Sequence, residues 1–231
     1  MIFATKNNPN GPAINKPETH SIDLSGTVLS FSMPEGNSYD KPNPLGTILD
    51  TVNIYERSVS SDKNSDSTVL ADRWFSYKGF LGEKLGSVNL MLRLYHLDKG
   101  KLNLFNNSDF TSYLDQYHKT HFEQWNEGAD EFGQILPPAS YENFDNNSIK
   151  FSHYNINEQQ STILRSLYAT PISDNCYIEF MFRYIGVRDT EAAWLKMANT
   201  LENNILSSVN IKLTDSEKSA MATAFESTGN D

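Results

Sequence analysis

The sequence predicts an α+β protein, in which an antiparallel β-sheet is flanked by amphipathic helices. The prediction depends most on the stretch from Cys176 to Val209. Its first half alternates between apolar and other side chains, as a strand does, and its second half repeats apolar side chains at helical spacing. Across the whole chain, strand-like runs come in two blocks with a helix after each, which indicates α+β and not a parallel βαβ array.

The strand and the helix of this stretch are expected to pack together. One side of the strand carries Ile178, Phe180, Phe182 and Tyr184, and the other side carries Glu179 and Arg183. Gly186 ends the alternation, and Asp189 is expected to cap helix 191–208. The apolar stripe of the helix comprises Trp194, Ala198, Leu201 and Ile205. Because a helix with a buried tryptophan needs a sheet to lie on, we expect it to cross the face that carries Phe180.

The remaining elements complete a single domain over residues 21–213. Residues 1–20 show no periodicity and are expected to form a flexible N-terminal arm, which could also pair with a sheet edge. The predicted strands are 27–33, 47–57, 68–77 and 87–97, followed by an antiparallel meander of 148–156, 162–169 and 177–185. Residues 214–231 are a C-terminal tail or short helix, for which Thr214 and Glu217 form a capping box.

An acidic insert at about 108–147 separates the two blocks of strands. Ser108 is expected to cap a helix through about Asn126, and 128–147 is expected to be an irregular link. The predicted core face of the helix comprises Phe110, Leu114, Tyr117, His121 and Trp125.

Composition limits the function classes. With 231 residues, of which 12% are aromatic, the chain can bury a hydrophobic core that does not depend on disulfide bonds or a structural metal. The single cysteine and the absence of an apolar leader indicate a reducing, cytoplasmic location, and no apolar run is long enough for a membrane span. The net charge of −10 argues against nucleic acid as the partner and favours a basic protein.

Three patterns could carry chemistry, and each has a structural explanation. Cys176 with His153 could be a nucleophile and its base, although a lone cysteine that opens a strand is usually a small buried hydrophobe. His118 and His121 could share a metal, but their spacing is not that of a zincin, and a core histidine is the ordinary outcome. Glycines 79, 82 and 86 lack the ending of a phosphate loop and are expected to form a connection between strands. We therefore predict no metal and no cofactor.

The acidic segment is the strongest candidate for a binding surface. Between Lys119 and Lys150 there are six acidic residues and no lysine or arginine, with aromatic residues among them. Carboxylates can steer a basic partner and aromatic rings can anchor it, so we predict a partner-binding surface; the alternative is a solvated loop. The predicted binding residues are Glu123, Trp125, Glu127, Asp130, Glu131, Phe132, Tyr141 and Glu142.

The order of elements resembles the PsbP-like fold group, which includes DcrB-like proteins and the EagR chaperones of type VI secretion. The resemblance rests on this order, on a strand that ends Ser-Met-Pro-Glu-Gly at 32–36, and on a helix that ends Asn-Asn-Ile-Leu-Ser-Ser-Val at 203–209. It implies a non-enzymatic binding protein: an immunity protein that occludes a secreted toxin, or a chaperone for such an effector. The insert at 108–147 makes the chain longer than the EagR pattern. The alternative function is a cysteine-dependent hydrolase or toxin that uses Cys176 with a histidine.

Overall fold

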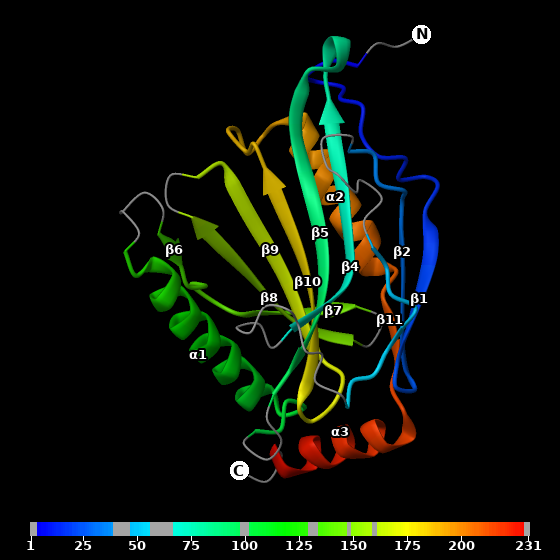
Figure 1. The fold of residues 1–231 in the computed structure, drawn as a ribbon, viewed down its shortest axis with the longest axis vertical. Helices are drawn as coiled ribbons and strands as arrows, with labels where there is room; N and C mark the ends of the chain where they lie inside the picture. The colour runs from blue at the N-terminus through cyan, green and yellow to red at the C-terminus, as the bar shows by residue number, and fades with distance from the viewer. Residues whose placement is uncertain are drawn as a thin grey trace.

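The computed structural model describes residues 4–38, 47–55, 67–97, 102–128, 134–146, 149–158 and 161–228. Within these ranges the chain has an α+β fold, with a seven-stranded antiparallel sheet, a small mixed sheet of four strands and three α-helices (Figure 1). The predicted fold class is therefore confirmed.

The large sheet has the strand order β4-β5-β10-β9-β8-β6, and β7 also pairs with β8. Its strands are β4 (Ser67–Lys78), β5 (Lys84–His96), β6 (Ile135–Leu136), β7 (Glu142–Asn146), β8 (Ile149–Glu158), β9 (Ile163–Pro171) and β10 (Cys176–Ile185). The small sheet has the order β11-β2-β1-β3, with β1 (Glu18–Leu24), β2 (Thr27–Met33), β3 (Thr51–Val52) and β11 (Asn210–Lys212). The helices are α1 (Asn107–Asn126), α2 (Ala193–Ser207) and α3 (Asp215–Thr228), and a short 3-10 turn, η1 (Phe80–Gly82), joins β4 to β5.

Strand β10 lies in the middle of the large sheet, between β5 and β9. It runs antiparallel to both, so that Phe180 is opposite Leu92 on one side and Tyr168 on the other. Strand β8 continues the pattern on the far side of β9. The predicted meander of three strands, β8-β9-β10, is thus confirmed, and β10 joins it to β5 in the large sheet.

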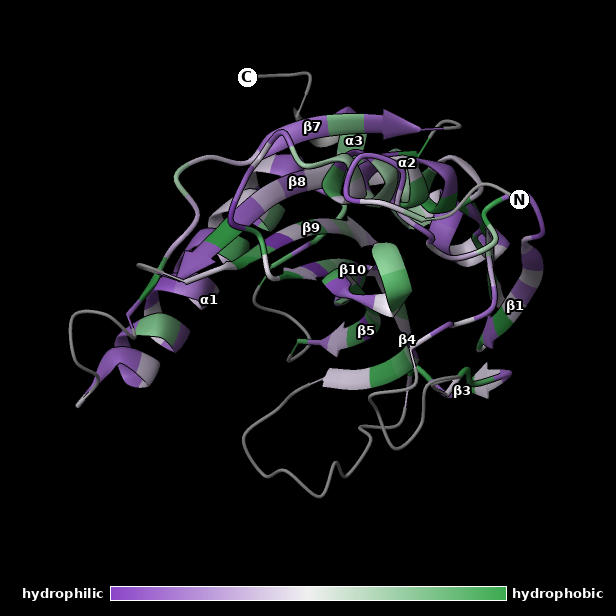
Figure 2. Ribbon diagram, turned by 90° about the horizontal axis from the view of Figure 1, so that it is seen from above, coloured by the Kyte–Doolittle hydropathy of each residue, from purple (hydrophilic) through white to green (hydrophobic). Residues whose placement is uncertain are grey.

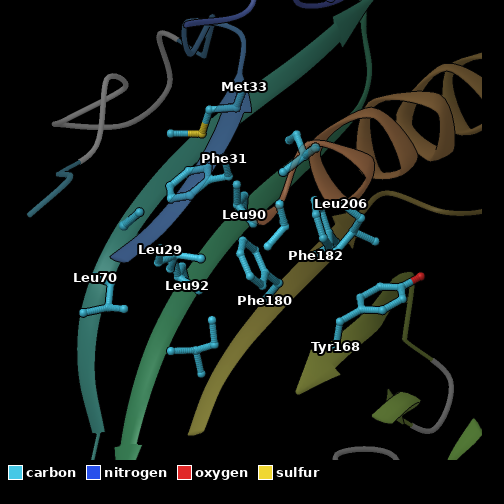
Figure 3. Packing of buried hydrophobic residues seen from close by; sticks show 14 of the residues in the cluster. Leu29, Phe31, Met33, Leu70, Leu90, Leu92, Tyr168, Phe180, Phe182 and Leu206 are labelled. Carbon is cyan, nitrogen blue, oxygen red and sulfur yellow. The ribbon is translucent and has the colours of Figure 1, made fainter. Parts of the chain in front are cut away.

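The main hydrophobic core lies between the large sheet and a layer made of α2 and β2. Alternate residues of β10, including Phe180 and Phe182, pack with Leu206 of α2 and with Phe31 of β2 (Figure 3). Trp194 is only 4% exposed in this core. The prediction that the helix crosses this face of the sheet is confirmed, because the apolar stripe of α2 and the alternation of β10 meet there.

A second core lies on the opposite face of the same sheet, under α1. Figure 2 shows α1 and α2 on opposite sides of the stacked strands. Leu114 and Phe122 of α1 pack with Tyr154 of β8 and Tyr177 of β10. The large sheet is therefore buried on both faces over part of its area, and the aromatic richness of the chain supplies both layers.

The indole of Trp194 packs directly against the backbone of Gly86 in the sheet, which is possible because glycine has no side chain there. A Cβ atom at Gly86 would lie 2.5 Å from Cζ2 of Trp194, well inside contact distance. Gly86 belongs to β5 itself, while Gly79 precedes the 3-10 turn η1 and Gly82 is its last residue. Gly79 and Gly82 thus belong to the connection between β4 and β5, as expected, whereas Gly86 lies inside β5 and allows α2 to pack closely.

Several predicted boundaries are wrong. In the described part of the run 47–57, which ends at residue 55, the strand is limited to Thr51–Val52. The link 128–147 contains β6 and β7, which pair with β8. Residues 18–20 belong to β1, inside the segment expected to be an arm, and Asn10 also bridges to Lys78.

The helix caps are also partly wrong. Asn106, and not Ser108, caps α1 by accepting hydrogen bonds from the Ser108 and Asp109 amides. Helix α2 begins after Ala192 without a side-chain cap, since Asp189 accepts instead from the Glu191 amide in the preceding turn. For α3, Thr214 Oγ1 does accept from the Glu217 amide at 3.2 Å.

We predict that Trp194→Ala lowers the free energy of unfolding by about 3–5 kcal/mol, because it leaves a cavity in the main core. Gly86→Ala should cost about 1–3 kcal/mol by overpacking against the indole. In the double variant the cost of Gly86→Ala should shrink, since the side chain that it meets is gone. Urea unfolding of the four proteins measures this coupling, with Asn199→Ala on the exposed side of α2 as the control. Strictly additive costs would show that the two sites are not in contact.

Candidate functional site

Helix α1 covers only part of its face of the large sheet, and a groove remains beside it. The groove has a volume of about 280 Å³. Strands β5, β8, β9 and β10 form its floor, and the C-terminal half of α1, including Phe122 and Trp125, forms one wall. Such a half-open concave surface is the ordinary location for a ligand or for an inserted side chain of a partner.

The floor of the groove carries charged side chains. Arg165 of β9 and Arg183 of β10 are direct partners in the antiparallel register. Arg165 forms an ion pair with Glu158, and both side chains are largely buried, at 14% and 22% exposed. The nearest Coulombic partners of Arg183 are the Arg165 guanidinium, which is unfavourable, and the Glu158 carboxylate, which is favourable. Two guanidinium groups thus share one carboxylate at this end of the groove.

A buried carboxylate occupies the other end. Glu179 of β10 is 3% exposed and lies opposite Arg93 of β5. It accepts hydrogen bonds from the hydroxyl groups of Tyr95, at 3.2 Å, and Tyr154. Desolvation by burial raises the pKa of Glu179, while the tyrosine hydroxyls and Arg93 act in the opposite direction. The alternation of the sequence predicted Glu179 on the face of β10 opposite Phe180, and it lies there. Helix α1 covers this part of the face, so Glu179 is buried and not solvated.

The buried line of α1 differs from the predicted one. Phe110 and Leu114 are buried as expected, but His118 and Phe122 follow them, in place of His121 and Trp125. Each four-residue step overshoots a full turn by about 40°, so the buried line moves around the helix. The predicted core positions of His121 and Trp125 are wrong, and both side chains are exposed.

His118 is held by tyrosine side chains. Its Nδ1 lies 3.1 Å from the hydroxyl oxygen of Tyr141, and its ring packs on Tyr154. Burial, with a smaller contribution from His121, lowers the pKa of His118 to about 4, so the ring is neutral at pH 7. Tyr141 is thereby half-buried beside the helix, which makes it a part of the second core as well as a candidate contact.

The predicted binding residues fall into three groups. Trp125 is 62% exposed at the C-terminal end of α1, and Glu123 and Glu127 are exposed on either side of it in the sequence. Tyr141 is half-buried, while Glu142, the first residue of β7, is exposed. The remaining three, Asp130, Glu131 and Phe132, lie outside the described residues. The structure thus places Trp125 in the wall of the groove, while Glu123 and Glu127 are exposed at the same end of α1.

Sequence reasoning missed the basic floor of the groove. Arg93, Arg165 and Arg183 are far apart in the sequence, and only the register of β5, β10 and β9 brings them to one surface. The one signal was that polar residues occupy the second face of otherwise apolar strands.

The candidate pair Cys176 and His153 is not brought together. Cys176 is 1% exposed. His153 is opposite Tyr168, which is itself opposite Phe180, so it lies two strands and four residues from Cys176. That separation corresponds to about 16 Å between Cα atoms. The histidine opposite Cys176 is His96, whose Nε2 lies 3.0 Å from the carbonyl oxygen of Ile54. The expectation that Cys176 is a buried side chain is confirmed, and His96 is buried as well.

The other candidate chemistry also lacks an assembled site. The described residues contain no group of three or more histidine, cysteine, aspartate or glutamate side chains that could hold a metal ion. In the same part of the chain, no helix has both the length and the apolar character needed to cross a membrane.

Comparisons with known proteins give distant structural similarity without a sequence family. No family model matches the chain, and no curated protein matches it. Among solved structures, it is similar to LpqN, involved in cell envelope biogenesis of Mycobacterium tuberculosis, with a TM-score of 0.34 and 8% identity over 86% of this chain and 92% of that one. It is also similar to TplEi, an immunity protein of the type VI secretion system from Pseudomonas aeruginosa in complex with "L" peptide. There the TM-score is 0.29 and the identity is 7%, over 89% of this chain and 92% of that one.

A third similar structure is a protein from Bacteroides thetaiotaomicron, with a TM-score of 0.27 and 11% identity over 82% of this chain and 46% of that one. At these values the similarities concern the arrangement of elements and assign no function.

We predict that Glu179 gives the stability of the protein a pH dependence. Because the pKa of Glu179 is raised above 4.5 in the folded state, its contribution to stability is full below pH 4.5 and falls as the pH rises through the folded-state value. Glu179→Gln removes this titration, so the stability of the natural protein relative to the variant should fall as the pH rises above 4.5. Urea unfolding of both proteins at a series of pH values checks this. Parallel pH profiles would contradict the assignment.

Proposed function

We propose that this chain is a non-enzymatic binding protein that occludes a partner protein with the surface around the C-terminal end of α1. More specifically, we propose that it is an immunity protein with a PsbP-like fold, which neutralises a secreted bacterial toxin in the cytoplasm. A chaperone for such an effector is the close variant. The observation that carries the proposal is the exposure of Trp125, a large aromatic side chain at the edge of a groove, with the exposed carboxylates of Glu123 and Glu127 nearby in the sequence.

The physical basis is the combination of an aromatic anchor with charged surroundings. Tryptophan is enriched at the centres of protein interfaces because it buries a large area with little loss of side-chain freedom. Carboxylates at the rim raise the association rate with a basic partner and contribute less to the final affinity. Such a surface can block the cationic cleft of a toxin by steric and electrostatic means, without any chemical step.

The burial of Cys176 and its separation from His153 support the non-enzymatic form of the proposal. Cys176→Ala should therefore leave partner binding and protection intact. Loss of activity in a Cys176→Ala protein that remains folded would favour the cysteine-dependent hydrolase instead.

We predict that the two parts of this surface affect different rate constants. A pull-down with the full chain as bait supplies the partner, and binding kinetics then compare the variants. Reversing Glu123 and Glu127 to lysine should slow association, and the on-rate of the natural chain should fall as salt rises towards 0.5 M, where the Debye length is about 4 Å. Trp125→Ala should mainly speed dissociation, by about tenfold or more.

Two exposed positions on α3 provide matched controls. Glu226→Lys introduces the same kind of charge reversal, and Phe225→Ala removes an aromatic ring that is 48% exposed. Both should leave the rate constants nearly unchanged. If the α1 variants bind at the same rates as these controls, the α1 surface is not the interface.

A further inference from the structure

The groove beside α1 contains positive charge that the described residues do not neutralise. Arg165 and Arg183 are directly opposite in the register of β9 and β10, which brings their Cβ atoms to about 5 Å. Like charges in this arrangement oppose sheet pairing. Glu158 is hydrogen-bonded to Arg165, whereas Asp72, nearby on β4, accepts from Asn89. The pair therefore keeps an excess of one positive charge.

The two guanidinium groups also have unused hydrogen-bond donors. Nη1 of Arg165 and Nε of Arg183 are buried, and neither has a hydrogen-bond partner in the described part of the chain. A buried donor without a partner is costly and rare in folded proteins. Burial and the neighbouring Arg165 lower the pKa of Arg183, although an arginine keeps its proton at neutral pH. Donors of this kind, close together and charged, fit the planar oxygens of a carboxylate.

The surroundings of the pair define the rest of the ligand. Met181 and Leu167 occupy the next positions on the same face, and Trp125 stands on the wall formed by α1. A single carboxylate balances the excess charge, and the apolar surfaces beside it suit a hydrophobic side chain. This combination is that of an acidic peptide segment with an apolar neighbour.

We propose that the Arg165–Arg183 pair binds a carboxylate on a peptide segment of the partner protein, whose adjacent apolar side chain lies against Met181 and Trp125. The proposal rests on the proposed function, and it adds an acidic contact inside the groove to the basic surface expected at the rim. The exposed carboxylates of α1 and the arginine pair in the groove carry charges of opposite sign. A partner segment that binds in a shifted position would place its charges against like charges, so only one register is favoured.

The experiment uses two dipeptides that differ in one charge, acetyl-Phe-Glu-amide and acetyl-Phe-Gln-amide. Each is titrated into the full ¹⁵N-labelled protein, and the Nε–H signals of the arginines and the indole N–H of Trp125 are followed by NMR. We expect the glutamate peptide to bind with a dissociation constant of about 1–10 mM, since it is a small ligand, and the glutamine peptide at least about tenfold more weakly. The perturbed signals should be those of Arg165, Arg183 and Trp125.

Arg183→Gln is the decisive variant, because among the described residues the carboxylate of Glu158 is hydrogen-bonded to Arg165 and none accepts a hydrogen bond from Arg183. It should abolish the preference for the glutamate peptide, while Lys196→Gln, which removes an exposed cation on α2, should retain it. A second variant, Arg165→Lys, keeps the charge but loses the planar fork and should weaken binding of the glutamate peptide.

Equal binding of the two peptides, no perturbation at the arginine pair, or an unchanged preference in a folded Arg183→Gln protein would each overturn the proposal. The dipeptide titration tests the carboxylate site in the absence of the partner. A negative dipeptide result therefore contradicts the carboxylate site without contradicting the proposed binding of a partner protein. If the partner binds Arg183→Gln as tightly as the natural chain, only the carboxylate site is wrong. If the dipeptide binds but the α1 variants leave partner kinetics unchanged, only the interface is wrong.

Discussion

The structure depends on the burial of β10 on both of its faces. One set of alternate side chains, represented by Phe180, enters the core beneath α2, and the other set, represented by Tyr177, enters the core beneath α1. Pairing with β5 and β9 satisfies the backbone of the same strand on both edges. Helices α1 and α2 therefore each pack on β10, on opposite faces of the sheet, and neither depends on contact with the other. Each is positioned by the same strand, and a change in the register of β10 would move every side chain to the wrong layer.

The groove follows from the incomplete cover that α1 provides. The first half of α1 packs on Tyr177 through Phe110, and its second half forms a wall of the groove whose floor carries Arg165 and Arg183. At one end of this floor, Glu179 is hydrogen-bonded to two tyrosines and lies opposite Arg93, while the arginine pair at the other end has donors left over. The polar groups around Glu179 are thus hydrogen-bonded, whereas the arginine pair keeps buried donors without a partner among the described residues, which is why we propose binding at the arginine pair.

Periodicity predicted the elements that are amphipathic over their whole length. The strand 87–97, the strand 177–185 and the stripe through Trp194 are confirmed, because each has one apolar face that must be covered. Strand β6 was missed, since it pairs with residues more distant in the sequence. Strand β7 forms a hairpin with the adjacent β8 but was missed because its mostly polar residues show no apolar alternation. The strand predicted at 47–57 was too long, because β3 is defined by its pairing with the distant β1.

The candidate site was harder to predict for the same reason. The stripe of α1 was assigned at mixed three- and four-residue spacing, whereas the buried line advances by four residues each time, which exposes Trp125. Six carboxylates in one segment led to the prediction of an acidic binding surface, and Glu123 and Glu127 of that segment are exposed. The arginine pair depends on strand register, which a single sequence does not specify.

Hydrogen–deuterium exchange of the chain with and without its captured partner tests whether the surface around the C-terminal end of α1 is the binding interface. We expect slower exchange in 117–128 and in the facing parts of β9 and β10, with α2 and the small sheet unchanged. Protection confined to α2 or to the small sheet would contradict it.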